Sequence, residues 1–286
     1  EFNSLAAIGK AGVQTAIEAL MRENKRVAQF GFSAAEFERA KSNALRNMED
    51  AYKEREKSQS AELASEFIRN FLVGEAIPGI EAEYAFHQVI MKQISLDDVN
   101  QFARTILVNQ EPKLIVYQGN DKPDHVIPDS QELMEMVKRA EQVAVTAYTE
   151  KKTVATLMDA PPQAGSIINE VKDPKLGTTT WTLSNGVTLV MKPSDFKNDQ
   201  ILLGASRAGG MSMVADTDFL QARYATTIVG VMGMKDIAPI ELGKFLAGKN
   251  VSVSTKFGEN FEGISGSSSK RDLETMLQVI YLAITA

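Results

Sequence analysis

The chain has 286 residues, of which 44% are hydrophobic and 24% are charged, and its formal net charge is −6. This composition excludes an intrinsically disordered chain, and the length fits two domains of ordinary size. The acidic balance gives no general attraction to phosphate backbones, so we expect no nucleic-acid partner. No apolar run approaches the roughly 20 residues that span a bilayer, so we expect no membrane segment in this portion.

The chain contains no cysteine, which excludes disulfides and thiolate metal sites but does not fix the compartment. We take a bacterial extracytoplasmic (periplasmic) location as the working hypothesis. The chain starts at Glu1 without a methionine and ends at Ala286 within an apolar helical run. We therefore expect it to be a piece of a longer protein.

The first 108 residues are predicted to be mainly helical, because apolar side chains recur there at helical spacing with charged residues between them. Ser33 and Glu36 form a capping box, since both side chains can accept hydrogen bonds from free N–H groups at a helix start. The densely charged run 50–57 is interpreted as a solvated helix face with pairs four residues apart. The predicted helices cover residues 12–30, 34 onward into the charged run, 60–72, 81–91 and 95–107.

The pattern then changes from helix to strand and back. The apolar run 113–117 predicts a buried strand that ends at Gly119, and the spacing of apolar residues predicts a helix over 130–149. From Lys151 this spacing fades into a stretch with prolines and glycines, which is typical of a linker. We therefore expect one domain at 1–150, a linker at 151–176 and a second domain at 177–286.

In the second domain, Asn185 and Gly186 stand between two alternating apolar runs. This pattern predicts a β-hairpin with a type I′ turn, which needs positive φ at both central positions. The complete order is three strands, two helices, two strands and a helix, which is typical of an α+β domain. After the hairpin, the elements are predicted at 201–206, 216–231, 239–247, 250–257, 260–266 and from 269–272 onward.

Two stretches resemble the pitrilysin–insulinase zinc peptidases. The passage 20–41, a helix, a glycine, the capping box and a second helix, is similar to the second domain of that family, as is 94–103 followed by 113–119. The hairpin at 181–193, with 241–254 and 262–267, is similar to the start of the third domain. Each motif is common by itself, and the order of the motifs is the more specific feature.

Members of this family are built as two halves, each of two α/β-sandwich domains, that close around an inner chamber. The resemblance implies that residues 1–150 are a second domain without its first strands, that 151–176 are the connector, and that 177–286 begin an inactive third domain. It also implies zinc for the complete protein, bound in a first domain upstream of this chain. The partners would then be the missing flanking domains of the same chain and a peptide substrate.

No catalytic or metal-ligating residue is predicted in this chain. In the family, the helix after the hairpin carries His-x-x-Glu-His, whereas the helix predicted at 216–231 has no histidine. His87 and His125 are the only histidines of the sequence, and neither has a second histidine three or four residues away. A catalytic zinc needs three protein ligands in fixed geometry, so we interpret both as ordinary histidines.

Other polar groups receive structural interpretations. Adjacent helix residues point about 100° apart, so Arg223 and Tyr224 cannot hold one ligand together. The serines at 265–269 are expected to end a strand and cap the last helix, and the acidic pairs at 97–98 and 216–218 to stabilise helix starts.

Arg207, Gly209 and Gly210 form the single hypothesis for substrate contact. The two glycines follow the strand at 201–206 and are interpreted as a turn. By the family resemblance, this turn would lie near a chamber-facing edge.

The sequence leaves three functions open. The first is a non-catalytic central segment of a zinc metalloendopeptidase that forms chamber wall and hinge. The second is an inactive scaffold or partner subunit of a peptidase-like assembly, and the third is an unrelated α+β interaction protein. Nothing in the chain separates the first two, because both predict a segment that by itself binds no zinc and cleaves nothing.

Overall fold

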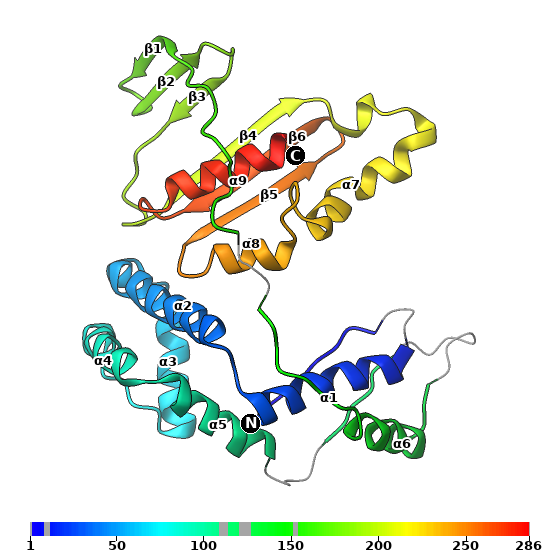
Figure 1. Cartoon of the computed structure of the whole chain (residues 1–286). Helices are drawn as coiled ribbons and strands as arrows, with labels where there is room; N and C mark the ends of the chain where they lie inside the picture. Colours follow the sequence, from blue (N-terminus) through cyan, green and yellow to red (C-terminus); the bar gives the residue numbers. More distant parts are fainter. Residues whose placement is uncertain (1, 9–11, 109–113, 120–126, 151–153, 286) are drawn as a thin grey trace. The chain divides into compact units, whose positions relative to one another are not determined.

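The computed structural model describes residues 2–8, 12–108, 114–119, 127–150 and 154–285, and these residues form an α+β architecture (Figure 1). The α-helices are α1 Gly12–Phe30, α2 Ala34–Lys53, α3 Ser60–Val73, α4 Ile80–Gln93, α5 Leu96–Val108, α6 Ser130–Glu141, α7 Phe219–Met232, α8 Pro239–Phe245 and α9 Leu273–Thr285. The strands are β1 Ile167–Asp173, β2 Thr178–Leu183, β3 Thr188–Met191, β4 Ile201–Ala208, β5 Val251–Phe257 and β6 Phe261–Ser268. Short 3₁₀ turns lie at Arg55–Lys57, Gly210–Met213 and Asp216–Asp218.

The chain divides into two compact units. Unit 1 comprises Glu1–Ala40 and Val89–Lys151, and unit 2 comprises Lys41–Gln88 and Lys152–Ala286. The chain therefore passes between the units within α2 and within α4. These limits differ from the domain boundaries expected from sequence, because the segment 41–88 packs with the C-terminal part of the chain. The evolutionary domain boundaries stay a prediction.

Unit 1 is a small group of helices in which α1 packs against α5 and α6. The turn between α1 and α2 passes through Gly31, whose φ is +73°, and the Asn100 side chain accepts a hydrogen bond from Phe32 N at 2.8 Å. The predicted capping box is confirmed: Ser33 N donates to Glu36 Oε2 at 2.8 Å, and Glu36 N donates to Ser33 Oγ at 3.2 Å. The local capping box thus sets where α2 begins.

The helix predicted over 130–149 is shorter than expected, since α6 ends at Glu141. In the extended chain that follows, backbone carbonyl groups accept hydrogen bonds from side chains of α1 instead of from helical N–H groups. Lys25 Nζ donates to Val143 O at 2.9 Å, and Arg26 Nε donates to Thr146 O at 3.0 Å. Two cations far away in sequence therefore hold the chain extended where the apolar spacing alone predicted a helix.

The strand predicted at 113–117 is wrong for its described part, because residues 114–119 belong to no strand. Lys113 lies outside the described residues. Leu114 is 89% exposed and Val116 is 77% exposed.

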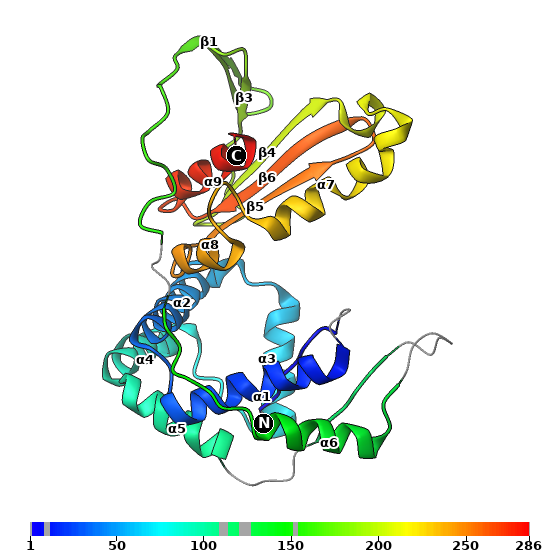
Figure 2. The same ribbon diagram turned by 45° about the vertical axis from the view of Figure 1, so that its right-hand side comes forward.

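Unit 2 contains two three-stranded antiparallel sheets, in the orders β1-β2-β3 and β4-β6-β5. Helix α9 runs along one face of the second sheet, and α7 lies beside β5 (Figures 1 and 2). The core cluster combines buried side chains from the 154–158 segment, the turn before α8, and α9. Its buried members are Leu157, Ile237, Val279 and Leu282.

Two features lie inside the stretch that the sequence indicated as linker. Leu157 is 3% exposed and belongs to the core of unit 2, and β1 at Ile167–Asp173 pairs with β2. The sequence analysis missed β1, because the apolar side chains in Ile-Ile-Asn-Glu-Val-Lys-Asp do not alternate with polar ones. The backbone hydrogen bonds with its partner strand β2 hold this segment in the extended conformation.

The predicted hairpin between β2 and β3 is confirmed, but its turn type was predicted incorrectly. Gly186 has φ +84°, whereas Asn185 does not have positive φ, so the turn is not type I′. Gly186 N donates to Leu183 O, and Leu183 N donates to Val187 O, both at 2.9 Å. This pattern is that of a three-residue loop with a glycine bulge, the next common way to join two strands.

None of the described helices combines the length and the apolarity that crossing a membrane requires.

Candidate functional site

Arg207, Gly209 and Gly210 lie at the end of β4, beside the β5–β6 hairpin. Arg207 is opposite Glu262 in the strand register, and its Nε and Nη2 lie 2.8 and 2.6 Å from Glu262 Oε2. The Arg207 side chain is 79% exposed. An exposed ion pair of this kind contributes at most about 1 kcal/mol to stability. Arg207 therefore has a partner in Glu262 and is still accessible to solvent.

The two glycines have conformations that other residues rarely adopt, with φ of +148° at Gly209 and +73° at Gly210. Gly209 N donates to Asn260 O at 3.1 Å, and Met211 N donates to Gly258 O at 2.9 Å. A Cβ atom on Gly210 would lie 2.3 Å from the Gly258 carbonyl oxygen. The interpretation as a turn is thus confirmed, and contact with a substrate stays a prediction.

The second sheet has one covered face and one open face. Gly266 faces α9, since a Cβ atom there would lie 2.9 Å from Met276 Sδ. Side chains alternate along a strand, so Phe261, Gly263 and Ser265 lie on the opposite face. Pairing across the sheet places Ser206 and Lys256 beside Gly263 on this open face.

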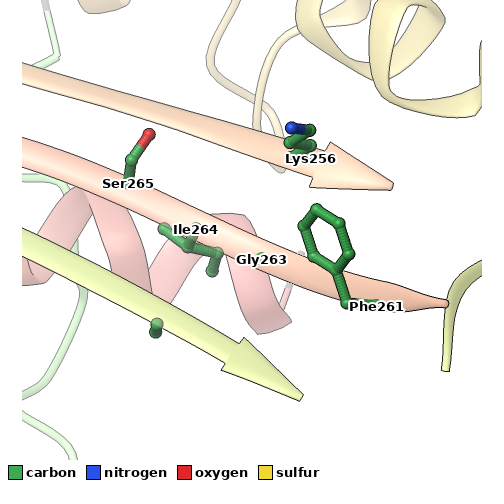
Figure 3. Close-up of a pocket in the computed structure, with 6 residues that line it drawn as sticks. Lys256, Phe261, Gly263, Ile264 and Ser265 are labelled. Atoms are coloured by element: carbon green, nitrogen blue, oxygen red, sulfur yellow. The ribbon is translucent and has the colours of Figure 1, made fainter. Parts of the chain in front are cut away.

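A shallow cavity of about 180 Å³ lies on this sheet (Figure 3). Its lining residues come from all three strands: Ala205, Lys256, Phe261, Gly263, Ile264 and Ser265. The Phe261 ring and the Lys256 ammonium stand beside Gly263, with the ammonium 5.1 Å from the ring centroid. Ser265 Oγ is 2.8 Å from Ser254 Oγ.

A second polar constellation is buried in unit 2 around Arg46 on α2. Its side chain is 3% exposed and lies 3.0 Å from Glu49, 3.2 Å from Asp50 and 3.4 Å from Asp272 at the start of α9. Asp272 also accepts hydrogen bonds from Asn250 N at 2.9 Å and from Ser269 Oγ at 2.7 Å. We call Arg46, Glu49, Asp50, Lys53, Asp199 and Asp272 the Arg46 cluster.

Lys53 and Asp199 complete the cluster. Lys53 Nζ lies 2.8 Å from Glu49 and 2.9 Å from Asp199, and the other Asp199 oxygen accepts from Lys270 N at 3.0 Å. The cluster therefore joins α2, the β3–β4 loop and the start of α9. The charged run at 50–57, interpreted from sequence as a solvated face, is in part an internal contact surface.

The charges in the cluster shift one another's protonation. The hydrogen bond from Lys53 lowers the pKa of Glu49 below its ordinary 4.5, with help from Arg46. Burial raises the pKa of Asp50 above 3.8. At Asp199 burial acts to raise the pKa, but hydrogen bonds from Lys53 and from the Lys270 backbone outweigh it, and this pKa is lowered. These groups act as a structural charge network.

The described residues hold no group of three His, Cys, Asp or Glu side chains placed to bind a metal ion. His87 lies half-buried on α4, and His125 lies outside the described residues. Helix α7, in the position where the family resemblance places His-x-x-Glu-His, reads Phe-Leu-Gln-Ala-Arg-Tyr-Ala-Thr-Thr-Ile-Val-Gly-Val-Met.

The helix-start interpretations are confirmed at two places. Ser269 caps α9, since Asp272 N donates to its Oγ at 3.2 Å. Asp98 accepts from Ser95 N at 2.8 Å at the start of α5, and the Ser95 hydroxyl and N–H lower the pKa of Asp98. Arg223 and Tyr224 are both exposed on α7.

Sequence reasoning missed the Arg46 cluster and the open-face cavity. Arg46 with Glu49 and Asp50 has the spacing of an exposed helix pair, so no local signal could have shown that it is buried. The cavity did leave a signal, because small residues alternate at 252, 254, 263, 265 and 267 on one face of two strands.

The chain matches no protein-family model. It is 28% identical over 261 residues to an Arabidopsis thaliana protein named zinc protease PQQL-like, and the aligned region covers 91% of this chain and 25% of that protein. It is 21% identical to a probable zinc protease PqqL of Haemophilus influenzae (80% and 24% covered) and 23% identical to the one of Escherichia coli (96% and 29% covered). The chain thus spans about a quarter of the length of the curated relatives it matches.

Two solved structures are also similar to the chain. One is the periplasmic protease PqqL from Escherichia coli, at a TM-score of 0.46 and 18% identity, covering 95% of this chain and 30% of that one. The other is the ferredoxin protease FusC in complex with Arabidopsis ferredoxin, at a TM-score of 0.44 and 16% identity, with the same coverage.

Proposed function

Because the chain is a relative of zinc proteases of the pitrilysin–insulinase type, we propose that it is the non-catalytic central segment of a zinc-dependent metalloendopeptidase. One observation carries the proposal. The similarity to proteins named as zinc proteases extends over 91% of this chain but only 25% of the first relative, and α7 has no histidine. Zinc and its ligands then belong to other parts of the complete protein.

The role proposed for this segment is to form chamber wall. The sheet β4-β6-β5 suits that role, because α9 covers one of its faces and the other is open. Among the described residues, β4 pairs with β6 and has no strand along its other edge. An extended peptide can bind to such an edge by adding a strand, and Arg207, Gly209 and Gly210 at the end of β4 would then lie beside it.

The hinge between the two halves is the second part of the proposal. Its expected position is 151–176, between a second domain at 1–150 and the start of a third α/β-sandwich domain at 177–286. Leu157 is anchored in the core of unit 2 and β1 is paired with β2, so we expect the hinge to exclude these two places. A periplasmic location of the complete protein also belongs to the proposal.

The isolated chain provides the direct test. We expect the purified chain to contain no stoichiometric zinc by elemental analysis and to leave a fluorogenic peptide library intact. A parallel sample with a chelator controls for contaminating proteases. Peptide hydrolysis that the chelator abolishes would overturn the proposal.

The alternative function is an inactive scaffold or partner subunit of a peptidase-like assembly. The coding sequence upstream of this chain separates it from the first proposal. A His-x-x-Glu-His motif there supports an active peptidase, and we expect zinc in the complete protein to be lost when either histidine is changed to alanine. If the complete protein has no such motif, the scaffold function is favoured.

A further inference from the structure

The cavity on the open face of the β4-β6-β5 sheet has the chemistry of a binding site for one side chain. Gly263 forms its floor, because a glycine at this central position leaves the space that a side chain would fill (Figure 3). Phe261 is two residues before Gly263 on the same face of β6, and Ser265 is two residues after it. Lys256 lies directly opposite Gly263 on β5.

The ammonium group of Lys256 is the charged group of the cavity. Its side chain makes a cation–π contact with Phe261, and among the described residues it has no carboxylate partner. Arg207, the cation at the end of strand β4 in the same sheet, is by contrast paired with Glu262. The cavity therefore presents a positive charge beside an apolar ring.

The hydroxyl pair adds a second donor. Ser254 Oγ and Ser265 Oγ lie 2.8 Å apart, and either can donate to the other. One hydroxyl proton forms the hydrogen bond between the two serines, and the other can be donated to a ligand. A carboxylate accepts from both an ammonium and a hydroxyl, whereas an amide carbonyl accepts more weakly because it carries no charge.

We propose that this cavity is a subsite that binds one carboxylate-bearing residue of an extended peptide, with Lys256 and the Ser254–Ser265 pair holding the carboxylate and Phe261 covering its apolar stem. The inference rests on the proposed function, because it takes the open sheet face as a peptide-contact surface. It goes beyond that function by naming the preferred side chain and the residues that recognise it.

The test compares two capped tripeptides, acetyl-Ala-Glu-Ala-amide and acetyl-Ala-Gln-Ala-amide, which differ by one charge at almost equal size. Each is titrated into the isotope-labelled full chain, and amide shifts are followed by NMR. We expect the glutamate peptide to bind about fivefold more tightly at low ionic strength and to move the signals of Lys256, Gly263 and Ser265. Added salt should reduce this preference.

Lys256→Met removes the charge but keeps the length of the side chain, and we expect it to abolish the preference for glutamate. Lys256→Arg should retain it. Lys175→Met removes an exposed lysine of the β1–β2 turn and serves as the matched control, with the preference unchanged. A Lys256→Met chain that still prefers glutamate would overturn the subsite.

The two proposals fail differently in this experiment. Equal binding of both peptides at the open face would contradict the carboxylate subsite and leave the peptide-contact surface in place. Binding of neither peptide would contradict both. Shifts confined to residues outside the β4-β6-β5 sheet would also place the peptide elsewhere and overturn the subsite.

Discussion

Arg46 is a buried charged residue of unit 2, with 4% of its surface exposed. Its guanidinium lies among four carboxylates, of Glu49, Asp50, Asp199 and Asp272, at distances from 3.0 to 3.9 Å. We expect Arg46→Met to lower the free energy of unfolding by about 3–5 kcal/mol, because the change leaves the buried Asp272 and the partly buried carboxylates beside it without their shared cation. Urea unfolding followed by circular dichroism measures this loss.

Arg69→Met provides the control for Arg46→Met within the same unit. The Arg69–Glu75 pair is short, at 2.8 Å, but its side chains are 53% and 44% exposed. Its loss should destabilise the chain far less than the loss of Arg46, because both partners stay in contact with solvent. Equal destabilisation by the two substitutions would show that Arg46 is not a buried anchor.

The pH dependence of stability follows from Glu49 and Asp199, whose pKa values are lowered in the folded chain. A carboxyl with a lowered pKa stabilises the fold fully above its unfolded pKa, which is near 4.5 for Glu and 3.8 for Asp. This stabilisation is lost as the pH falls through the lower, folded values. Asp50, whose pKa is raised, contributes in the opposite sense.

Lys53→Met tests this assignment, because Lys53 hydrogen-bonds both Glu49 and Asp199. We expect the variant to be less stable than the original chain at pH 7, and the difference in melting temperature to shrink as the pH falls below about 4. Thermal unfolding of both proteins across this pH range provides the measurement. A difference that stays constant down to pH 2 would contradict the role of Lys53.

At the scale of elements, the turn at the end of β4 has a stringent backbone requirement. Gly210→Ala should lower the stability by at least about 2 kcal/mol, because an alanine there has strained positive φ and overlaps the Gly258 carbonyl. Gly204→Ala, within β4, is the matched control, since its new Cβ meets no atom within 4 Å. If the two variants unfolded at the same urea concentration, the structural role of Gly210 would be refuted.

At the same scale, local signals predicted most helices well and the strand partners less well. The starts of α2 and α5 follow from Ser33 with Glu36 and Ser95 with Asp98, whose hydrogen bonds span three residues. In contrast, the end of α6 depends on Lys25 and Arg26, more than 110 residues earlier in the chain. A window of sequence around α6 does not contain that information.

At the scale of the whole molecule, the segment 41–88 belongs with the C-terminal part of the chain. We therefore expect a fragment 154–286 to be less stable than unit 2 in the full chain, because Asp199 and Asp272 lose Lys53 and Arg46. Hydrogen exchange of the α9 amides in the two proteins measures the difference. Equal protection of α9 would show that unit 2 does not need its N-terminal segment.

The candidate site was predictable only in part. The sequence placed Arg207, Gly209 and Gly210 together at the end of a strand, and the structure has them there. It did not show that Lys256 would stand opposite Gly263, because this neighbourhood depends on the β5–β6 register. Contact of Arg207, Gly209 and Gly210 with a substrate stays a prediction.

The sequence by itself determined the α+β class, the hairpin at Asn185–Gly186, the positions of most helices and the resemblance to the zinc peptidases. These features depend on side chains within a few residues of one another or on the order of such motifs along the chain. Only the tertiary structure decided that Arg46 and Leu157 are buried, that α6 ends at Glu141 and that 114–119 is not a strand. The burial of these residues and the end of α6 depend on partners from distant parts of the chain, which no short window of sequence contains.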